Sequence, residues 1–511
     1  MKVKATINVL TMLENSCIKN PGRTAVRERE SFLTYAELTE LSKRAGSALA
    51  GSISAHSPVG VYMEKGINAL VAFFGTIYAG AFYSMFNTEL PDERLRSMRT
   101  VLDTKSIITT RELYEKAALL FPEAGIFVIE DLIASEINEA ALAEIRSSMI
   151  DTDPLYINFT SGSTGIPKGI AVSHRSVIDF ISFFTQIFSI TQDDILANQA
   201  PFDFDVSVKD IYSAMYVGAE LVIVPREYFS APVKLIDYLC DNRITVMIWA
   251  VSALCLISTF HGLDYRTPET VRKILFSGEV MPYKHLCQWQ QHLPDTLFVN
   301  LYGPTEITCN CTYHILEKDR DYSAGIPIGI PFPNEDVFLL SAENERITEK
   351  NVKGSVVVRG TALALGYYRE AQKTAESFIQ NPLNKCYPEP VYLTGDLGEY
   401  NENGELVFRG RSDNQIKYMG HRIELEEIER AMSAIDGVDR CMCIFDESKQ
   451  RLKGFYMGTI EKNELVTVMR STMPAFMVPG FVRRVDQMVL TKNGKLDRKK
   501  TAELIGGGKN G

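Results

Sequence analysis

The sequence predicts an α/β fold, with a large layered N-terminal domain and a small α+β C-terminal domain. Residues 1 to about 150 alternate helical periodicity with short apolar runs, which is typical of a layered α/β domain. From about residue 325 the pattern changes to short β-like segments separated by Gly and Pro, and a unit of about 100 residues follows. We therefore expect domains at 1–411 and 412–511, with a β-rich subdomain over about 325–411.

The individual elements are predicted from their hydrophobic patterns. Residues 33–49 have a helical pattern, for which Thr34 is a candidate N-terminal cap. Short apolar runs predict strands at 59–63, 106–110, 155–157, 221–224, 246–249, 273–277 and 297–301. In the C-terminal unit, the pattern predicts a helix over 424–435 and strands near 441–445 and 454–460.

The charge and the cysteine content exclude several classes of function. The chain has 54 Lys+Arg against 64 Asp+Glu, a formal charge of -10, so its overall field repels nucleic acid and anionic lipid surfaces. The nine cysteines are odd in number and contain no C-x-x-C pair, which argues against a disulfide framework or a zinc site. No segment has the apolar length of a signal peptide or a membrane span, so we expect a cytoplasmic protein without membrane insertion.

A loop rich in Gly, Ser and Thr follows the apolar run at 155–157. Its residues 160–169 read TSGSTGIPKG, and their backbone N–H groups and hydroxyls can surround a phosphate, with Lys168 adding positive charge. The order Lys168-Gly169 is the reverse of a Walker A motif, which disfavours a P-loop nucleotidase. A flexible surface linker is the alternative interpretation.

A second segment, residues 300–306, reads NLYGPTE at the end of an apolar run. The aromatic ring of Tyr302, the hydroxyl of Thr305 and the carboxylate of Glu306 suit an adenine ring, a phosphate and a Mg²⁺ ion respectively. A tight turn without any ligand is the alternative.

These two segments and four later ones resemble the motifs of the adenylate-forming superfamily. That group contains acyl-CoA synthetases, luciferases and the adenylation domains of nonribosomal peptide synthetases. The motifs occur in the expected order and span most of the chain, at 159–169, 300–306, 392–397, 410–417, 420–429 and 493–498.

The resemblance implies an enzyme that uses ATP and Mg²⁺. It places the loop at 160–169 on the β- and γ-phosphates, Tyr302 on adenine, Asp396 on the ribose hydroxyls and Arg411 nearby. The residues it assigns to ATP binding are Thr160, Ser161, Gly162, Ser163, Thr164, Gly165, Lys168, Asn300, Tyr302, Gly303, Thr305, Asp396, Arg411 and Lys495.

Three residues carry the catalytic roles that the resemblance implies. Thr305 contacts the α-phosphate, Glu306 is the metal ligand, and Lys495 bridges the substrate carboxylate and the α-phosphate while pyrophosphate leaves. Asp413 matches a hinge, about which the small domain rotates between adenylation and thioester formation.

An amino acid is the expected substrate. In amino-acid-activating members, an Asp followed two residues later by Ser holds the α-ammonium group, and Asp205 and Ser207 fit that pattern. A buried carboxylate is stable opposite a cation, which fatty and aryl acids lack. A loop or helix-cap role for Asp205 is the alternative. The residues assigned to the substrate are Asp205, Val206, Ser277, Gly278 and Leu301, and related domains also place Ile248, Leu275, Cys309 and Asn310 around the pocket.

Within this group the chain most resembles stand-alone D-alanine–D-alanyl carrier protein ligases. It departs from them at Ser277, where those ligases usually carry Cys, so a small amino acid is expected but D-alanine is open. Lys209 lies four residues after Asp205. If it points into the pocket it suits a carboxylate-bearing side chain, but the sequence favours an ordinary Lys on the outer surface of a helix.

The sequence thus predicts a ligase that activates a small amino acid as aminoacyl-AMP and passes it to the phosphopantetheine thiol of a separate carrier protein. No carrier motif is visible after Lys495. An acyl- or aryl-CoA synthetase is the alternative enzyme, and a non-catalytic binding module is the alternative outside enzymology.

Overall fold

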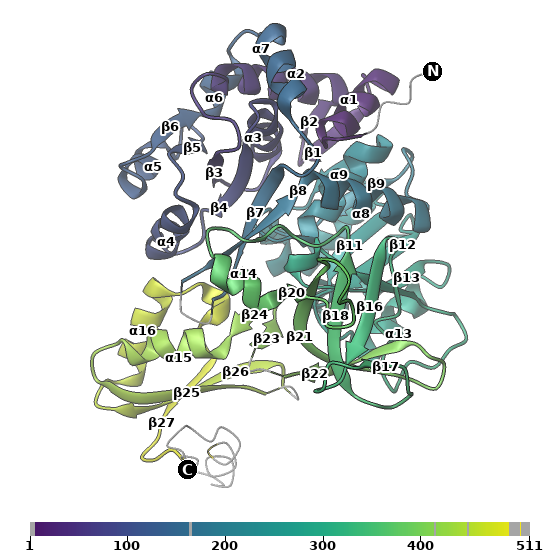
Figure 1. The fold of residues 1–511 in the computed structure, drawn as a ribbon, viewed down its shortest axis with the longest axis vertical. Coiled ribbons are helices and arrows are strands. Elements are labelled where there is room, and N and C mark those ends of the chain that lie inside the picture. The colour runs from purple at the N-terminus through teal and green to yellow at the C-terminus, as the bar shows by residue number, and fades with distance from the viewer. Residues whose placement is uncertain (1–5, 163–165, 413–414, 447–448, 490–500, 502–511) are drawn as a thin grey trace. The chain divides into compact units, whose positions relative to one another are not determined.

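The computed structural model describes residues 6–162, 166–412, 415–446, 449–489 and 501, and it confirms the predicted α/β class with a large N-terminal and a small C-terminal part (Figure 1). The chain divides into two compact units. Unit 1 comprises Met1–Thr88, Arg99–Phe159 and Gly169–Ser412, and unit 2 comprises Glu89–Met98, Thr160–Lys168 and Asp413–Gly511. We keep the ranges 1–411 and 412–511 as a proposal for the domains.

Sheet 1 carries the first half of unit 1. Its described strands run in the order β19-β8-β7-β4-β3-β5-β6, and the neighbours β4, β3, β5 and β6 are parallel. The bounds are β3 Pro58–Met63, β4 Phe82–Asn87, β5 Ser106–Thr109, β6 Gly125–Val128, β7 Pro154–Thr160, β8 Lys168–Ser173 and β19 Gly366–Tyr367. The predicted strands at 59–63, 106–110 and 155–157 therefore exist, with ends that differ by at most three residues.

Sheet 2 lies in the same unit and follows the order β15-β14-β13-β12-β11-β9-β10-β1-β2. The strands from β13 to β9 pair in parallel, as do β9, β10 and β1. The bounds are β1 Thr24–Glu28, β2 Ser31–Thr34, β9 Ile195–Asn198, β10 Glu220–Ile223, β11 Val246–Ala250, β12 Lys273–Ser277, β13 Leu297–Tyr302, β14 Thr312–Ile315 and β15 Ile330–Pro331. Because the carboxyl ends of parallel strands share one edge, the loops after β9, β12 and β13 are brought together.

Helices cover the two sheets. Those of unit 1 are α1 Leu10–Lys19, α2 Tyr35–Leu49, α3 Ile67–Tyr78, α5 Tyr114–Leu120, α6 Ile129–Ile133, α7 Glu139–Ser148, α8 His174–Ile187, α9 Val206–Val217, α10 Pro232–Asp241, α11 Val251–Thr259, α12 Gly262–Tyr265, α13 Tyr283–His292 and α14 Ala371–Ser377. Thr34 caps α2 as predicted. Its hydroxyl accepts a hydrogen bond from the Glu37 N–H, and the Glu37 carboxylate accepts one from the Thr34 N–H. A Cβ on Gly75 of α3 would lie 2.7 Å from Ala45 Cβ, so glycine permits the close packing of α2 against α3.

The main core fills the space between the sheets and these helices. Its fully buried aromatic members include Tyr35, Phe73 and Phe74, and Phe73 stacks on Tyr83 with ring centroids 4.0 Å apart. Helix α9 is buried along nearly all its length, from Val206 to Met215. This helix therefore lacks the solvent-facing side that an amphipathic surface helix has.

The β-rich part of unit 1 forms a third, antiparallel sheet with the order β17-β16-β18-β21-β20, to which β22 adds beside β21. The bounds are β16 Glu335–Leu340, β17 Arg346–Ile347, β18 Gly354–Gly360, β20 Phe378–Gln380, β21 Pro390–Tyr400 and β22 Leu406–Arg411. These short strands agree with the β-like sequence pattern that begins at about residue 325.

Unit 2 has its own small core. Two antiparallel strands, β23 and β24, accompany a sheet of order β25-β26-β27, on which α15 and α16 pack around Ile428, Met432 and Leu465. The bounds are β23 Gln415–Tyr418, β24 His421–Glu424, α15 Leu425–Ser433, β25 Val438–Asp446, β26 Arg451–Gly458, α16 Lys462–Thr472 and β27 Phe481–Arg484. Helix α4, Asp92–Leu102, has its residues 92–98 in this unit and the rest in unit 1.

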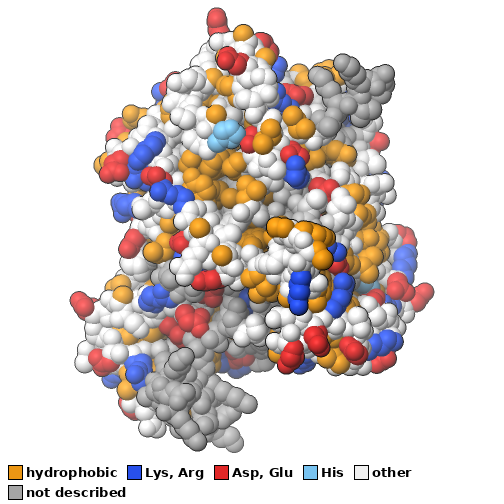
Figure 2. Space-filling view, in the orientation of Figure 1, with side chains coloured by type: hydrophobic (Ala, Val, Ile, Leu, Met, Phe, Trp, Pro, Cys, Tyr) orange, Lys and Arg blue, Asp and Glu red, His pale blue; other side chains and the backbone are white. Residues whose placement is uncertain are grey.

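The surface mixes charges of both signs. Acidic and basic side chains are interspersed on the face shown in Figure 2, with hydrophobic side chains between them. Among the helices that the structure describes, none combines the length and the apolar character needed to cross a membrane. The nine cysteines, all within the described ranges, are thiols.

Candidate active site

Tyr302, Asp396 and Arg411, which are far apart in the sequence, meet in one buried cluster. Tyr302 ends β13, while Asp396 and Arg411 are paired across β21 and β22. The Tyr302 hydroxyl donates to Asp396 Oδ2 at 2.5 Å, and Arg411 Nη1 donates to Asp396 Oδ1 at 2.5 Å. Burial and the neighbouring Asp396 raise the pKa of Tyr302 well above 10, so the phenol stays protonated and remains a donor.

Glu306 lies in a short 3₁₀ turn, Thr305–Ile307, directly after β13. Its side chain is buried, and Oε1 accepts a hydrogen bond of 2.8 Å from the Tyr367 hydroxyl. Gly303 permits this sharp exit from β13, because a Cβ there would lie 2.5 Å from the Cα of Asn310. Thr305 is buried beside Glu306.

The carboxylate of Glu306 fits Mg²⁺ that arrives with ATP. The described residues contain no cluster of three or more His, Cys, Asp or Glu that could hold a metal ion by themselves. Mg²⁺ differs from zinc in this respect, because proteins usually bind it through one or two carboxylates together with substrate phosphates and water. One buried carboxylate beside a hydroxyl residue is therefore compatible with a shared ATP–Mg²⁺ site.

The described ends of the loop predicted to bind phosphate make contacts within unit 2. Ser161 Oγ donates to the Arg422 carbonyl oxygen at 2.7 Å, and the Gly162 N–H donates to Glu427 Oε2 at 3.1 Å. Lys168 Nζ lies 3.8 Å from Glu424 Oε1. The Gly162 N–H thus binds an anionic oxygen, which is the property that a phosphate-binding loop requires.

Several predicted residues lie outside the described part of the chain. These are Ser163, Thr164, Gly165, the hinge residue Asp413 and Lys495. Thr160 is the last residue of β7. Asn300 lies in β13, and its side-chain amide donates to the Pro327 carbonyl oxygen at 2.8 Å, so it ties β13 to the following segment.

Asp205 is buried at the N-cap position of α9, yet its side chain forms no capping hydrogen bond with the described first turn. The helix-cap alternative therefore lacks the bond that would define it. The Asp205 main-chain oxygen accepts from Cys309 Sγ at 3.2 Å. The neighbouring Val206 and Leu301 are also buried, so the predicted substrate residues lie in the interior of unit 1.

The expectation that Lys209 points outward is wrong. Its side chain is fully buried (0% exposed), and Nζ donates to Asn310 Oδ1 at 2.6 Å and to Ser277 Oγ at 3.2 Å. The physical reason is that α9 is packed against other parts of unit 1 on all its faces. Lys209, one helical turn after Asp205, therefore does not reach solvent. Lys209 thus joins two residues of the predicted pocket, Ser277 and Asn310.

The turns that present Ser277 and Asn310 need unusual backbone conformations. Gly278 follows β12 with a φ of 96°, a value that L side chains rarely adopt. Thr308 and Cys309 have φ values of 47° and 75°, and the Thr308 hydroxyl holds this turn by donating to the Ala362 carbonyl oxygen at 2.7 Å. Consecutive non-glycine residues in the left-handed region are costly and often occur at functional sites.

Tyr367 is a candidate functional residue that the sequence did not predict. It pairs with Ile170 in sheet 1 through β19, and its hydroxyl reaches Glu306, 61 residues earlier. A strand of two residues has no recognisable pattern in a single sequence, and an isolated Tyr does not indicate a contact with Glu306. The contact becomes evident only when β19 is placed beside β8.

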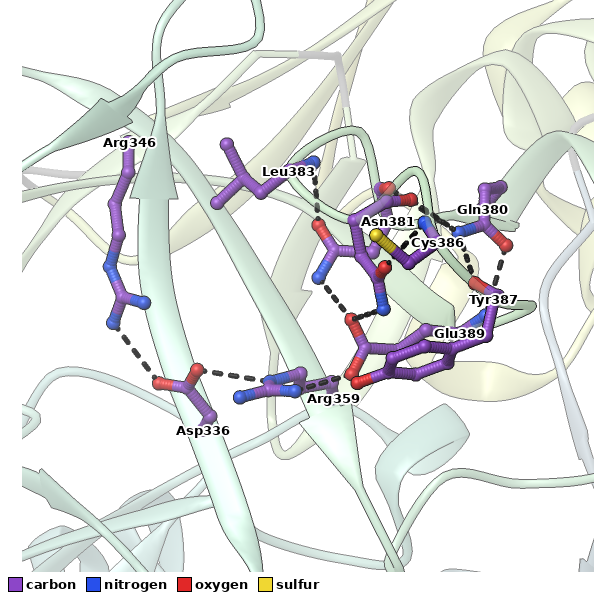
Figure 3. Close-up of polar contacts among 10 residues, drawn as sticks. Asp336, Arg346, Arg359, Gln380, Asn381, Leu383, Cys386, Tyr387 and Glu389 are labelled. Carbon is purple, nitrogen blue, oxygen red and sulfur yellow. Dashed lines mark hydrogen bonds and ion pairs between the residues drawn. The ribbon is translucent and has the colours of Figure 1, made fainter.

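A separate cavity of about 280 Å³ lies in the β-rich sheet (Figure 3). Asp336 lies between Arg346 and Arg359, at 3.2 Å and 3.0 Å, and Arg359 also pairs with Glu389. The predicted site residues do not line it, and these four charged groups neutralise one another in pairs. We therefore do not assign the ATP or substrate site to this cavity.

Comparisons with known proteins agree with the geometry. A family model described as "AMP-binding enzyme" matches residues 13–368, and the model of the AMP-binding enzyme C-terminal domain matches residues 427–495. The chain belongs to the AMP-binding enzyme family. It is therefore an adenylate-forming enzyme, as the motifs predicted.

The relatives of this AMP-binding enzyme include proteins named as synthases. Zwittermicin A synthase ZmaJ from Bacillus cereus is 31% identical over 510 residues, covering 96% of this chain and 94% of that protein. Bacitracin synthase 1 from Bacillus licheniformis is 30% identical over 96% of this chain, but the match covers only 9% of its own length.

Solved structures share the fold. The Vibrio cholerae adenylation domain AlmE, in complex with glycyl-adenosine-5'-phosphate, aligns with a TM-score of 0.84 and 21% identity, covering 99% of each chain. Holo-PA1221, which contains adenylation and PCP domains, aligns with a TM-score of 0.83 and 24% identity, covering 98% of this chain and 84% of that one. At these identities the likeness establishes the fold of the AMP-binding enzyme.

Proposed function

We propose that this enzyme activates an amino acid with ATP, forming aminoacyl-AMP and pyrophosphate, and then transfers the aminoacyl group to the phosphopantetheine thiol of a separate carrier protein. The observation that carries the amino acid assignment is the buried carboxylate of Asp205, which caps no helix. A buried carboxylate is a favourable site for a cation, and the α-ammonium group of an amino acid is a cation of suitable size.

The Tyr302–Asp396–Arg411 cluster supports binding of the nucleoside. An ionised carboxylate has about four acceptor positions, so Asp396 can accept ribose hydroxyls in addition to its bonds from Tyr302 and Arg411. The ring of Tyr302 provides a face for adenine. Because Tyr302 and Arg411 hold Asp396 from two sides, the carboxylate is oriented before ATP binds.

The first half-reaction is an in-line substitution at the α-phosphorus. An oxygen of the amino acid carboxylate forms a bond to phosphorus, the bond to the β-phosphate oxygen breaks, and pyrophosphate leaves with the electron pair. Glu306 would hold Mg²⁺, which would supply positive charge opposite the phosphates. Thr305 donates a hydrogen bond to the α-phosphate, and Lys495 stabilises the charge that develops on it, which lowers the barrier more than it aids binding.

In the second half-reaction the carrier thiolate attacks the aminoacyl carbonyl, and AMP leaves. The relatives named as synthases and the adenylation and PCP domains of holo-PA1221 support a carrier protein as the acceptor. The rotation about Asp413 and the cytoplasmic location stay predictions, as does the absence of nucleic acid partners.

The buried ammonium of Lys209 supports a finer assignment of the substrate. Its contacts with Asn310 and Ser277 place a cation among the predicted pocket residues, where an anionic or oxygen-bearing side chain is the best partner. We therefore assign a small amino acid whose side chain carries an oxygen acceptor, a carboxylate most favourably. D-alanine lacks such a group and serves as the first comparison.

The test is ATP–pyrophosphate exchange by the purified enzyme. The panel comprises D- and L-amino acids, β-amino acids, aryl acids and fatty acids, each at several concentrations. We expect exchange with amino acids alone, strongest for a small acidic or hydroxylated one. A fatty or aryl acid as the best substrate would establish an acyl- or aryl-CoA synthetase and overturn the proposal, and no exchange with any acid would indicate a binding module.

A further inference from the structure

Lys65 connects the two large sheets of unit 1. It follows β3 of sheet 1, and its Nζ donates to the carbonyl oxygens of Asn198, Gln199 and Ala200, at 3.4, 3.1 and 3.5 Å. These carbonyl groups end β9 of sheet 2 and begin the loop to α9, the helix whose N-cap residue is Asp205. One side chain of sheet 1 therefore holds the start of the loop that leads to Asp205.

The same loop is held at two further points. Asn87, the last residue of β4, donates its side-chain amide to Asp203 Oδ1 at 3.2 Å. Asn198 donates its side-chain amide to Asp210 Oδ2 of α9 at 2.8 Å. Residues 199–205 are thus fixed at their start by Lys65, in the middle by Asn87 and at the following helix by Asn198.

The charges around Lys65 favour its role as a fixed cation. Burial lowers the pKa of Lys65 to about 8, while the carboxylates of Asp210, Glu28 and Asp203 act in the opposite direction. Glu28 also accepts the Ile67 N–H at 2.9 Å, so it braces the turn that follows Lys65. Burial raises the pKa of Asp210 to about 8, and the hydrogen bond from Asn198 and the positive charges of Lys209 and Lys65 oppose that shift.

We propose that Lys65 is a positioning residue for substrate selection: by holding the carbonyl groups of residues 198–200, it fixes the loop so that Asp205 faces the α-ammonium group of the amino acid. This inference rests on the proposed role of Asp205. It goes beyond that role because Lys65 acts through the carbonyl groups of the loop and is not among the residues assigned to ATP or to the amino acid. If Lys65 only joined the two sheets, its loss would change the KM for the amino acid and the KM for ATP by the same factor.

The test compares Lys65→Met with the unaltered enzyme in ATP–pyrophosphate exchange. Methionine keeps most of the side-chain volume but removes the three hydrogen bonds. Each of these bonds has a charged donor, and losing it leaves a carbonyl group without that partner. We therefore expect the KM for the amino acid to rise about tenfold or more, with a smaller change in kcat and an unchanged KM for ATP. Lys65→Arg keeps the positive charge, so its amino acid KM is expected to stay close to that of the unaltered enzyme. Lys43→Met is the matched control, because Lys43 forms an exposed ion pair with Glu139.

Two further measurements keep the proposal falsifiable. Hydrogen exchange of the 199–205 peptide, measured without substrates, is expected to accelerate in Lys65→Met and not in Lys43→Met. Asn87→Ala removes the second support and is expected to change the amino acid KM in the same direction. Equal increases in both KM values, or an unchanged amino acid KM in folded Lys65→Met, would overturn the inference.

The design also separates this inference from the proposed function. If the unaltered enzyme shows no exchange that depends on an amino acid, the proposed function fails whatever the Lys65 variants do. If exchange depends on an amino acid and on Asp205, but Lys65→Met behaves as the unaltered enzyme does, only the positioning role of Lys65 is wrong.

Discussion

Lys209 Nζ donates a hydrogen bond of 2.6 Å to Asn310 Oδ1, and both residues are almost completely buried. One lies in α9, and the other follows the strained turn at Thr308 and Cys309. This bond places a cation in the interior of unit 1, among the predicted substrate residues, and makes Lys209 the best candidate for recognition of the substrate side chain.

Replacing Lys209 with Met tests that assignment. We expect kcat/KM for an acidic or hydroxylated amino acid to fall about tenfold or more, because a hydrogen bond from a charged donor contributes about 1.5–3 kcal/mol. We expect kcat/KM for an apolar amino acid of similar size to rise. Exchange measured over the same amino acid panel gives both values.

Lys234→Met is the matched control for Lys209, because Lys234 is an exposed residue of α10. It should leave the amino acid preference unchanged. An unaltered preference in Lys209→Met would place its ammonium group away from the substrate.

The Tyr367–Glu306 hydrogen bond predicts a role for Tyr367 in metal binding. Tyr367→Phe removes only the hydroxyl, so Glu306 keeps its position in the chain but loses one bond that orients its carboxylate. A neutral hydrogen bond contributes about 0.5–1.5 kcal/mol, so we expect the Mg²⁺ concentration for half-maximal exchange to rise about three- to tenfold.

Binding of Mn²⁺ in the presence of ATP, measured by electron paramagnetic resonance, provides a readout that does not depend on turnover. It should weaken in Tyr367→Phe and remain unchanged in Tyr368→Phe, a change at the neighbouring position. Equal Mn²⁺ affinity in the two variants would show that Tyr367 has no part in positioning Glu306.

His174 predicts a specific loss of stability in acid. Burial lowers the pKa of this fully buried imidazole to about 3, whereas the unfolded chain has the ordinary value of 6.5. Below pH 6.5 the unfolded state therefore binds a proton that the native state does not, and the free energy of unfolding falls as the pH falls. The contribution is about 1.4 kcal/mol for each pH unit well below 6.5.

Urea denaturation between pH 7.5 and 5 checks this prediction. His174→Gln should be less stable at neutral pH but should lose stability with a shallower slope as the pH decreases. His56→Gln, at a half-exposed histidine, should keep the slope of the unaltered protein. A slope unchanged by His174→Gln would mean that this imidazole becomes protonated in the native state.

The sequence predicted the local features of the fold well. The strand at 273–277 has the predicted bounds, Thr34 caps α2, and the helix predicted at 424–435 is α15, which spans Leu425–Ser433. These features depend on residues within a few positions of one another, so hydrophobic periodicity and capping chemistry are sufficient to predict them.

The features that depended on tertiary packing could not be predicted in this way. The direction of the Lys209 side chain depends on which faces of α9 are covered by other elements. The spacing of residues along the helix does not show which faces are covered. Tyr367 reaches Glu306 only through the pairing of β19 with β8, and Lys65 reaches residues 198–200 only because two sheets meet. Thr308 and Cys309 also have positive φ values, which a sequence usually indicates by Gly or Asn, and neither residue type occurs at these two positions.

The most direct test of the central claim is ATP–pyrophosphate exchange with the preferred amino acid and with the same acid lacking its α-amino group, by the unaltered enzyme and by Asp205→Ala. We expect the unaltered enzyme to prefer the amino acid strongly, and Asp205→Ala to raise the amino acid KM about a hundredfold while the KM for ATP is unchanged. Equal use of both acids by the unaltered enzyme would contradict amino acid activation through Asp205.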